Sequence, residues 1–180
     1  MVYVLLGTGF EETEAILPVD LLRRAGTDVI TVGINGKTVY GSHRIGIEAD
    51  ITIDQMDLTK LEMLVLPGGL GGVASIKASP LAMDAIRFAH QNRKWVAAIC
   101  AAPTILAQLG ITDGKQAVCY PGCEEEMGEA HILPDRACIR DGHVITGTSA
   151  GCAAAFGLEL IAVLKGKDEA ERIARQIVIR

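Results

Sequence analysis

Short apolar runs alternate along this chain with stretches in which apolar side chains recur at helical spacing. The runs are short and rich in Val, Ile, Leu and Ala, which is typical of strands buried on both faces of a parallel sheet. We predict strands at residues 3–6, 29–32, 63–66, 96–99 and 117–120. We predict helices at residues 11–25, 80–90, 104–109, 153–164 and 167–179. This alternation predicts a three-layer α/β fold, with a mostly parallel central sheet and helices on both faces.

Turn and breaker signals modify this pattern in three places. Asn35-Gly36 is a hairpin-type turn signal, and the Gly-rich stretch that follows it to Ile53 predicts a small antiparallel excursion off the main sheet. Asp141-Gly142 predicts a hairpin over residues 138–146. Pro18 falls inside the first helix and removes one of its hydrogen bonds, so we expect a kink or an irregular first turn there.

Length and composition narrow the class of protein. The 180 residues contain no internal repeat, linker or low-complexity segment, so we expect a single domain over residues 1–180 that needs no disulfide or metal. The net charge of −5, the aromatic content of 4% and the lack of a basic stretch argue against a nucleic-acid partner. No apolar run is long enough to span a bilayer and the N-terminus lacks a basic leader, so we expect no membrane partner and a cytoplasmic location. Five cysteines, an odd number, fit free thiols in a reducing compartment.

The segment from Lys94 to Thr104 is the most informative, because it predicts a buried strand that ends on a cysteine and turns at once into a helix. Alanines on both sides of Cys100 leave room for a sharp backbone turn, as in a nucleophile elbow. We expect the sulfur to lie at a helix N-terminus, where unpaired N–H groups and the macrodipole lower the pKa of a thiol. The same segment also fits a buried, inert cysteine, the commoner state of a free thiol in a core.

Two further loops leave strands at the edge of the sheet where ligands of α/β proteins bind. The loop after the first strand leads to Glu14, about one turn into the first helix. A carboxyl held next to a thiolate has a raised pKa, stays protonated and can move a proton. The loop after the third strand carries Gly69 and Leu70, whose amides are candidates for an oxyanion hole. No G-K-[ST] follows these glycines, so nucleotide binding is disfavoured.

The spacing of the remaining candidate ligands assigns neither a base nor a metal site. The chain has four histidines, namely His43, His90, His131 and His143. His43 lies in the Gly-rich excursion, from which it can reach a shared site only through folding or dimerisation. Cys119 and Cys123 lack the second ligand pair of a closed zinc site, so we expect no metal. Cys123 as a resolving thiol for an oxidised Cys100 is a further hypothesis.

Four motifs spread over nearly the whole chain resemble those of the ThiJ/PfpI superfamily, most closely its branch of parkinsonism-associated deglycase-like (DJ-one) proteins. The motifs are Glu11-Glu12-Thr13-Glu14 with Pro18-Val19-Asp20 and Arg24-Ala25-Gly26, Val65-Leu66-Pro67-Gly68-Gly69, Ala97-Ala98-Ile99-Cys100-Ala101-Ala102-Pro103, and Thr146-Gly147-Thr148-Ser149-Ala150-Gly151 with Phe156-Gly157-Leu158-Glu159. They look like that branch's first helix, oxyanion loop, nucleophile elbow, and late loop with its helix. The elbow is the most specific of them, and the last motif matches less strictly.

The resemblance implies a flavodoxin-like sandwich and a homodimer. It also implies that Cys100 is the reactive, oxidisable thiol, Glu14 its protonated partner, and Gly69 with Leu70 the amide donors. Ala101, directly after the thiol, belongs to the expected binding residues.

Two positions depart from the family pattern. Tyr120, also an expected binding residue, stands where many members have a histidine, and a tyrosine hydroxyl is a poor base near neutrality. His43 falls near the position from which a relative's arginine reaches the site across the dimer, which makes His43 a candidate site residue contributed by a second chain.

We therefore expect a cysteine-dependent, cofactor-independent enzyme that acts on small reactive carbonyls such as methylglyoxal, or on their early adducts with protein side chains, in the glyoxalase or deglycase manner. Two alternatives stay open. One is a redox sensor or redox-regulated chaperone in which Cys100 is oxidised to a sulfinic acid and capped by Glu14. The other is an amidase or peptidase of the PfpI type, which Tyr120 disfavours.

Overall fold

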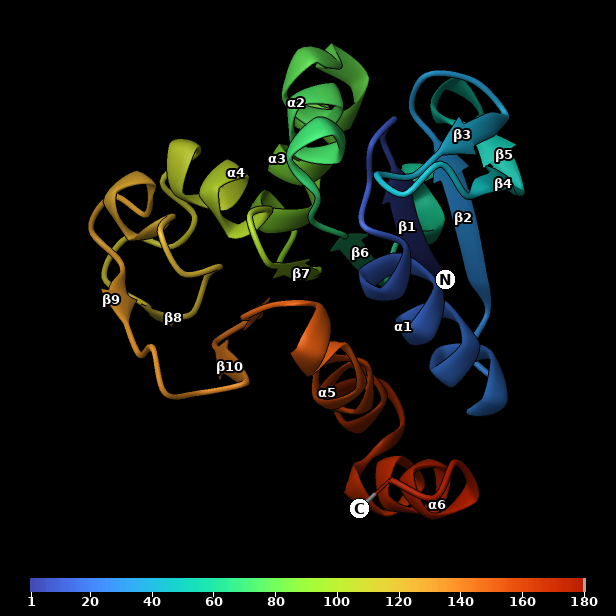
Figure 1. Ribbon diagram of the computed structural model, residues 1–180, viewed down its shortest axis with the longest axis vertical. Coiled ribbons are helices and arrows are strands. Elements are labelled where there is room, and N and C mark those ends of the chain that lie inside the picture. Colours follow the sequence, from blue (N-terminus) through green and yellow to red (C-terminus); the bar gives the residue numbers. More distant parts are fainter. Residues whose placement is uncertain (180) are drawn as a thin grey trace.

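A seven-stranded sheet forms the centre of the computed structural model, which describes residues 1–179 (Figure 1). Its strands, in spatial order, are β10 (Cys138–Asp141), β11 (Val144–Gly147), β7 (Trp95–Ile99), β6 (Met63–Leu66), β1 (Val2–Leu6), β2 (Val29–Gly33) and β5 (Ile51–Thr52). Neighbouring strands are parallel except at the β10–β11 edge, which is antiparallel. The order of β2, β1, β6, β7 and β11 is that of a flavodoxin-like sheet, so the predicted fold class is confirmed.

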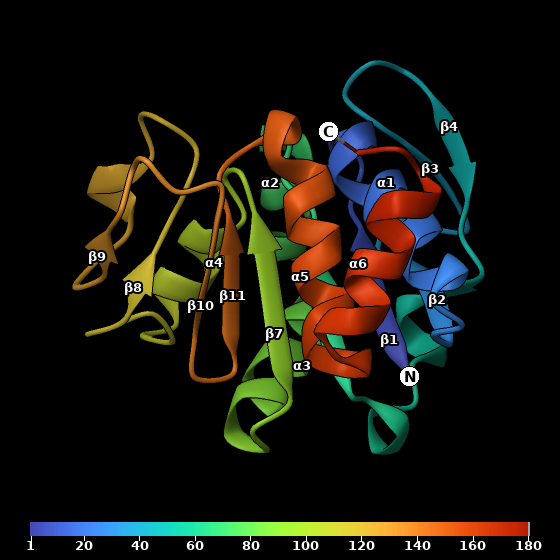
Figure 2. The ribbon, with the colours of Figure 1, turned by 90° about the horizontal axis from the view of Figure 1, so that it is seen from below.

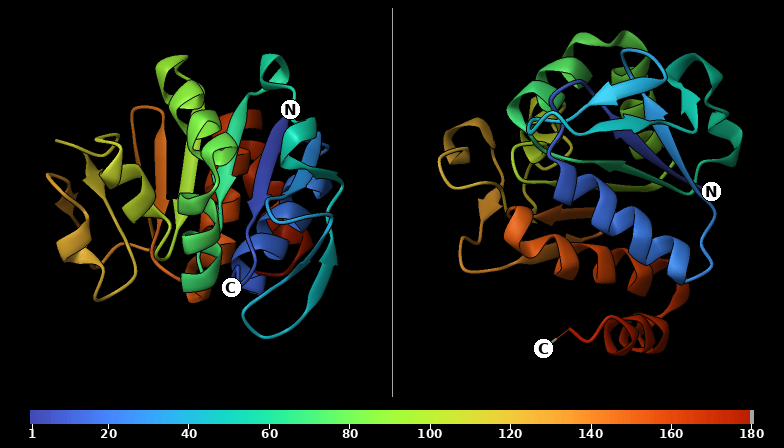
Figure 3. Two further views of the ribbon diagram at one scale, coloured as in Figure 1. Left: turned by 90° about the horizontal axis from the view of Figure 1, so that it is seen from above. Right: turned by 45° about the vertical axis from the view of Figure 1, so that its right-hand side comes forward.

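Helices cover both faces of the sheet. One face carries α1 (Glu12–Arg24) and α5 (Ala153–Lys165), with α6 (Lys167–Gln176) packed on α5 (Figures 2 and 3). The other face carries α2 (Leu70–Ala78), α3 (Pro80–Gln91) and α4 (Pro103–Gln108). Successive side chains of β1 point to opposite faces, so Val2, Val4 and Leu6 join the core under α1 and α5, while Tyr3 and Leu5 join the core under the other helices. None of the helices within residues 1–179 is long and apolar enough to cross a membrane.

Most predicted elements are present, and each difference has an identifiable physical cause. The strands predicted at 3–6, 29–32, 63–66 and 96–99 each differ from the observed strands by at most one residue. The strand predicted at 117–120 is absent, because only β8 (Gln116–Ala117) is extended there and it pairs with β9 (His131–Ile132) outside the main sheet. Helix α2, which the sequence pattern does not predict, begins at Leu70, directly after the loop that follows β6.

Glycines at the start of α2 explain why the sequence pattern does not predict that helix. Glycine is a poor helix former, so the Gly71-Gly72 pair favours a loop by propensity. A Cβ atom on Gly72 would lie 2.7 Å from the Cα of Phe10, so glycine is needed there for α2 to approach the loop after β1. Tertiary packing therefore overrides local propensity at the edge of the sheet where the candidate site lies.

The first helix runs through Pro18 without a break from Glu12 to Arg24, in contrast to the expected irregular first turn. Pro18 is buried where α1 and α5 pack side by side. A Cβ atom on Gly157 of α5 would lie 3.3 Å from the Cα of Pro18, which shows how closely the two helices approach. Packing on α5 thus holds the helix together across the missing hydrogen bond.

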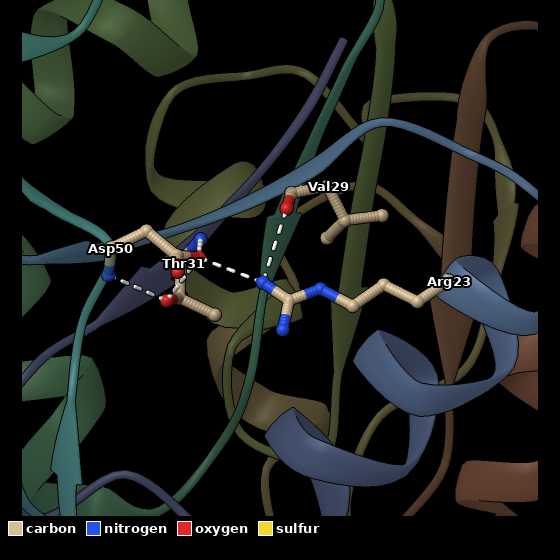
Figure 4. Close-up of polar contacts among 4 residues, drawn as sticks. All are labelled: Arg23, Val29, Thr31 and Asp50. Atoms are coloured by element: carbon tan, nitrogen blue, oxygen red, sulfur yellow. Dashed lines mark hydrogen bonds and ion pairs between the residues drawn. The ribbon is translucent and has the colours of Figure 1, made fainter.

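The antiparallel excursion is present, but its tight turn is not at Asn35-Gly36. Strands β3 (Thr38–Tyr40) and β4 (Gly46–Glu48) form a hairpin whose connection is residues 41–45. The chain returns to the sheet at Asp50, whose Oδ2 accepts hydrogen bonds from the backbone N and Oγ1 of Thr31, both at 2.8 Å, and from Arg23 Nη2 at 2.8 Å (Figure 4). This contact joins α1 and β2 to Asp50, shortly after β4, and so anchors the end of the hairpin at which the chain returns to the sheet.

Candidate active site

Loops from the carboxyl ends of four neighbouring parallel strands, β1, β6, β7 and β11, meet at one edge of the sheet and enclose a cavity of about 540 Å³. The structure brings all of the predicted site residues to this cavity: Cys100, Glu14, Gly69, Leu70, Ala101, Tyr120 and His43. Sequence reasoning assigned no role to four further lining residues: Glu11, Ser149, Ala150 and Gly151. The carboxyl edge of the β1–β6 pair, where the strand order reverses, is also the usual ligand position of this fold.

Cys100 occupies a sharp turn after β7, as the flanking alanines predict. Its φ of 67° lies in the left-handed region, which costs a non-glycine residue about 1–3 kcal/mol. Two hydrogen bonds hold this conformation: Cys100 N donates to Gly147 O at 2.9 Å, and Tyr120 N donates to Cys100 O at 2.8 Å. Helix α4 begins only at Pro103 and has six residues, so the N–H groups that act on the sulfur are those of Gly69 and Ala101.

Glu14 lies in the first turn of α1 and its side chain is 1% exposed. Glu11 caps the helix by accepting the Glu14 backbone N–H at 2.8 Å, and Gly68 N donates to Glu14 Oε2 at 2.9 Å. The other carboxyl oxygen, Oε1, is buried and has no hydrogen-bond partner among the described residues. Burial raises the pKa of Glu14 to about 7, although Cys100 and the amides of Gly68 and Ala150 favour its charged form.

The thiol of Cys100 is not the low-pKa group that the sequence predicted. Burial, the negative charge of Glu14 and the hydrogen bond with that carboxyl raise the pKa of Cys100 to about 12, against the opposite effect of the Gly69 and Ala101 amides. The two groups titrate as a coupled pair. The pKa of Glu14 lies closer to neutral pH than that of the thiol, so Glu14 is the member of the pair that exchanges a proton there.

Glycines are required where β6 turns toward the thiol. A Cβ atom on Gly68 would lie 2.5 Å from Glu14 Oε2 and 2.6 Å from Cys100 Cβ, so a side chain there would separate the pair. Gly69 has a φ of 82°, and a Cβ atom on it would lie 2.6 Å from Glu11 N. Of the two predicted amide donors, Gly69 acts on the sulfur together with Ala101, whereas Leu70 opens α2 and its side chain is 79% exposed at the rim.

His43 reaches the cavity of its own chain, held there by Glu12. Glu12 Oε2 lies 2.9 Å from His43 Nδ1, while its Oε1 accepts the His43 backbone N–H at 2.7 Å and Ser42 Oγ donates to Oε2 at 3.1 Å. Burial opposes ionisation of Glu12, but these hydrogen bonds outweigh it and lower its pKa to about 2. The hydrogen bond to Glu12 in turn raises the pKa of the exposed His43.

Within residues 1–179, Glu11, Glu12 and His43 form the one group of three metal-ligand side chains whose donor atoms all lie within 4.8 Å of one another. The hydrogen bonds from the hairpin already occupy the carboxylate of Glu12. Such a cluster of acidic groups therefore needs no metal to explain it.

The remaining histidines and cysteines of the sequence analysis do not line the cavity of Cys100. His143 Nε2 and His90 Nδ1 are 3.0 Å apart at the opposite end of the sheet, where His143 O accepts the Val96 backbone N–H. Cys119 is buried next to Met127, and Cys123 packs on the same small cluster. Cys123 lines a neighbouring hollow rather than the cavity of Cys100.

Known proteins resemble this chain over nearly its whole length. The model of the DJ-1/PfpI family matches residues 1–163. Protein dj-1beta of Drosophila melanogaster is 35% identical over 98% of this chain and 95% of that protein, and its crystal structure superposes with a TM-score of 0.95 over 99% of this chain and 97% of that chain. The Parkinson disease protein 7 homolog of Danio rerio is 31% identical over 98% of this chain and 96% of that protein.

A third relative is more distant. Deglycase PH1704 of Pyrococcus horikoshii is 28% identical over 91% of this chain and 99% of that protein. With the family model matched from the first strand into the late helix α5, and two relatives above 30% identity along almost the full length, this chain belongs to the DJ-1/PfpI family.

Proposed function

We propose that this chain is a cysteine-dependent, cofactor-independent enzyme acting on small reactive carbonyls such as methylglyoxal, or on their early adducts with protein thiols and amines. The observation that carries the proposal is the strained Cys100, which lies beside the buried carboxyl of Glu14 inside a cavity. The deglycase name of the Pyrococcus relative supports an enzyme of this general kind.

The first step joins the substrate to the sulfur. As a lone pair of Cys100 Sγ attacks the aldehyde carbon, Glu14 takes the thiol proton, and the π electrons of the carbonyl move to its oxygen. The amides of Gly69 and Leu70, which line the cavity, and the amide of Ala101, which acts on the sulfur together with Gly69, supply N–H donors for that oxygen. Glu14 then returns the proton to the oxygen, which leaves a neutral hemithioacetal on Cys100.

The later steps need only proton transfers and water. Glu14 removes the proton from the first carbon, whose electron pair forms the carbon–carbon double bond of an enediol as the ketone oxygen takes up a proton. Glu14 then delivers its proton to the second carbon while the hydroxyl of the first carbon loses its proton, which gives a thioester at the first carbon and a hydroxyl at the second. Water then attacks the thioester, the carbon–sulfur bond breaks, and lactate leaves with the thiol restored. The redox change is internal to the substrate, so the scheme requires no external oxidant or reductant. With an adducted side chain, Glu14 protonates the departing amine or thiol as its bond to the carbinol carbon breaks, and the carbinol hydroxyl loses its proton. This re-forms the aldehyde, which Cys100 then attacks as above.

Direct measurement of lactate in an amine-free buffer tests the proposal, because reversible adducts consume methylglyoxal without forming lactate. We expect the wild-type protein to form lactate and Cys100→Ala to form it only at the uncatalysed rate. Cys138→Ala is the matched control, since Cys138 is a free thiol outside the cavity, and we expect it to retain activity. Full activity in Cys100→Ala would refute the assignment.

Redox sensing is the second candidate function, favoured by the same N–H groups around the sulfur. In this role, hydrogen peroxide oxidises Cys100 to a sulfinic acid whose oxygens accept hydrogen bonds from the Gly69 and Ala101 amides and from protonated Glu14. A sensor would oxidise at Cys100 under mild peroxide while forming lactate barely above background. Rapid lactate formation with slow oxidation would favour the enzyme.

We also propose that the chain associates as a homodimer through the face formed by α1 and the hairpin. Ile16 of α1 is 37% exposed and Ile45 of the hairpin connection is 54% exposed. Together with Leu17 and Ile47 they line a hollow of about 580 Å³, and clustered exposed apolar side chains of this kind mark association surfaces. Light scattering should give the mass of a dimer for the wild type and of a monomer for Ile45→Asp. A monomeric wild type would contradict this proposal.

A further inference from the structure

A second hollow of about 220 Å³ adjoins the candidate active site, and we call it the α2–α4 groove. It is lined by Leu70 and Lys77 of α2, Ala101 and Thr104 at α4, and Cys123 and Glu126 of the following loop. Leu70 and Ala101 also line the cavity of Cys100. The two hollows therefore share a wall, which a molecule bound at the sulfur has to cross to reach the groove.

The floor of the groove is neutral and well packed. Ala101 and Thr104 are 4% and 3% exposed, and the Thr104 hydroxyl already donates to Ala101 O at 2.8 Å. The floor therefore offers apolar contacts to a ligand and no free hydrogen-bonding group. Leu70, 79% exposed, forms an apolar ridge between the two hollows, against which an alkyl chain can pack.

The far end of the groove carries one charge of each sign. Lys77 Nζ and Glu126 Oε2 are 3.8 Å apart, too long for a direct hydrogen bond, and their side chains are 31% and 65% exposed. An exposed pair at this separation contributes little to stability, so both groups are available to a ligand. A zwitterionic α-amino acid head group has the complementary pattern, with a carboxylate for Lys77 and an ammonium for Glu126.

The length of the groove matches one amino-acid side chain. Lys77 lies seven residues after Leu70 on α2, a rise of about 10 Å along the helix. An extended lysine side chain that carries a three-carbon adduct on its nitrogen spans a comparable length between its head group and the adduct. Methylglyoxal alone is much smaller and leaves the groove empty.

We propose that the α2–α4 groove is a substrate subsite that binds the zwitterionic head group of a free amino acid, with lysine the best fit, whose side-chain adduct lies at Cys100. This inference rests on the proposed function, and it narrows the adducted substrates to free amino acids. Lys77 and Glu126 are binding residues in this proposal and take no part in the chemistry.

Calorimetry with a stable ligand tests the subsite without turnover. The ligand is Nε-lactoyl-lysine, titrated into Cys100→Ala, and the matched ligand is the same compound with its α-amine acetylated and its carboxylate converted to a methylamide. We expect the capped ligand to bind about fivefold more weakly, and Lys77→Ala and Glu126→Gln to weaken the free ligand by a similar factor each. Lys60→Ala is the control, because Lys60 pairs with Asp57 outside both hollows, and it should leave binding unchanged.

Two results would overturn the subsite: equal binding of the free and capped ligands, or no binding of either. Loss of binding in Lys77→Ala without any loss for the capped ligand would support recognition of the head group. The outcome is separable from the proposed function, because lactate formation from methylglyoxal is measured independently. Turnover without ligand binding removes only the subsite, whereas binding without turnover keeps the subsite and removes the chemistry.

Discussion

Glu12 and Glu14 lie two residues apart in the first turn of α1, and their pKa values are shifted in opposite directions, to about 2 and to about 7. Residues at this spacing do not share a helix face. Glu12 meets the hairpin, where burial is outweighed by the hydrogen bonds of His43 and Ser42. Glu14 meets Cys100, and there burial dominates. One carboxylate is therefore a constant structural anion, while the other exchanges a proton near neutral pH.

The reactivity of Cys100 should follow the titration of Glu14. Below pH 7 Glu14 is protonated, and above it the carboxylate can take the proton of the thiol and so generate the nucleophile. We expect the rate of lactate formation, and that of Cys100 alkylation, to rise through about pH 7. In Glu14→Gln the rise near pH 7 should disappear, and lactate formation at pH 8 should fall by about 100-fold or more, the usual contribution of a general base.

Glu11→Gln provides the matched comparison for that profile. The charge of Glu11 raises the pKa of Glu14, while a glutamine at the cap keeps an oxygen acceptor for the backbone N–H. We expect the rise in reactivity to move to lower pH with little change in the plateau. A profile that stays in place in both variants would show that Glu14 does not control the thiol.

The same titration should appear in the stability of the protein. The folded-state pKa of Glu14, about 7, lies above the ordinary value of 4.5, so the folded protein binds this proton more tightly than the unfolded chain does. The contribution is fully present below pH 4.5 and is lost as the pH rises through 7. It amounts to about 3 kcal/mol, from the shift in pKa. Urea unfolding at pH 4.5 and 7.5 should show this loss in the wild type and not in Glu14→Gln.

The difference between the free energies of unfolding of the wild type and Glu14→Gln separates the contribution of Glu14 from those of its neighbours. Glu12 has a lowered pKa, so its contribution is present above the ordinary value and is lost as the pH falls toward about 2. His43 has a raised pKa, so its contribution is lost as the pH rises through that value in both proteins. Equal slopes for the wild type and Glu14→Gln between pH 4.5 and 7.5 would contradict the raised pKa.

Local sequence patterns were sufficient for four strands of the sheet, β1, β2, β6 and β7, and for the position of the thiol. β1, β6 and β7 are continuous apolar runs, and the alanines around Cys100 match its left-handed turn. The direction of the pKa shift of Cys100 could not be predicted from local sequence, because it depends on how deeply the folded protein buries the thiol and on the charge of Glu14, a residue far away in the sequence. Helix α2 could not be predicted from local sequence either, because its glycines are needed for close approach to the loop at Phe10 and do not favour a helix.

Gly68→Ala should separate Cys100 from Glu14 with little change elsewhere. The added methyl group would lie 2.5 Å from Glu14 Oε2 and 2.6 Å from Cys100 Cβ, so one of them must move. We expect lactate formation to be lost and stability to fall by about 1–3 kcal/mol, the range for overpacking. Gly114→Ala is the control: it has open space and a φ of 68°, so it should lose stability through strain while it retains activity. Retained activity in Gly68→Ala would show that the pair tolerates separation.

His43 should bind the carboxylate that forms in the product. Its Nδ1 is held by Glu12 at 2.9 Å, which leaves the N–H of Nε2 for a ligand in the cavity. We expect inhibition by lactate to weaken several-fold in His43→Gln and to be preserved in His43→Arg, because the arginine restores a cation. Glu12→Gln removes the cause of the raised pKa of His43, so inhibition should be lost at a lower pH than in the wild type. Equal lactate inhibition in wild type and His43→Gln at pH 6, where the imidazole of the wild type is charged, would exclude this role.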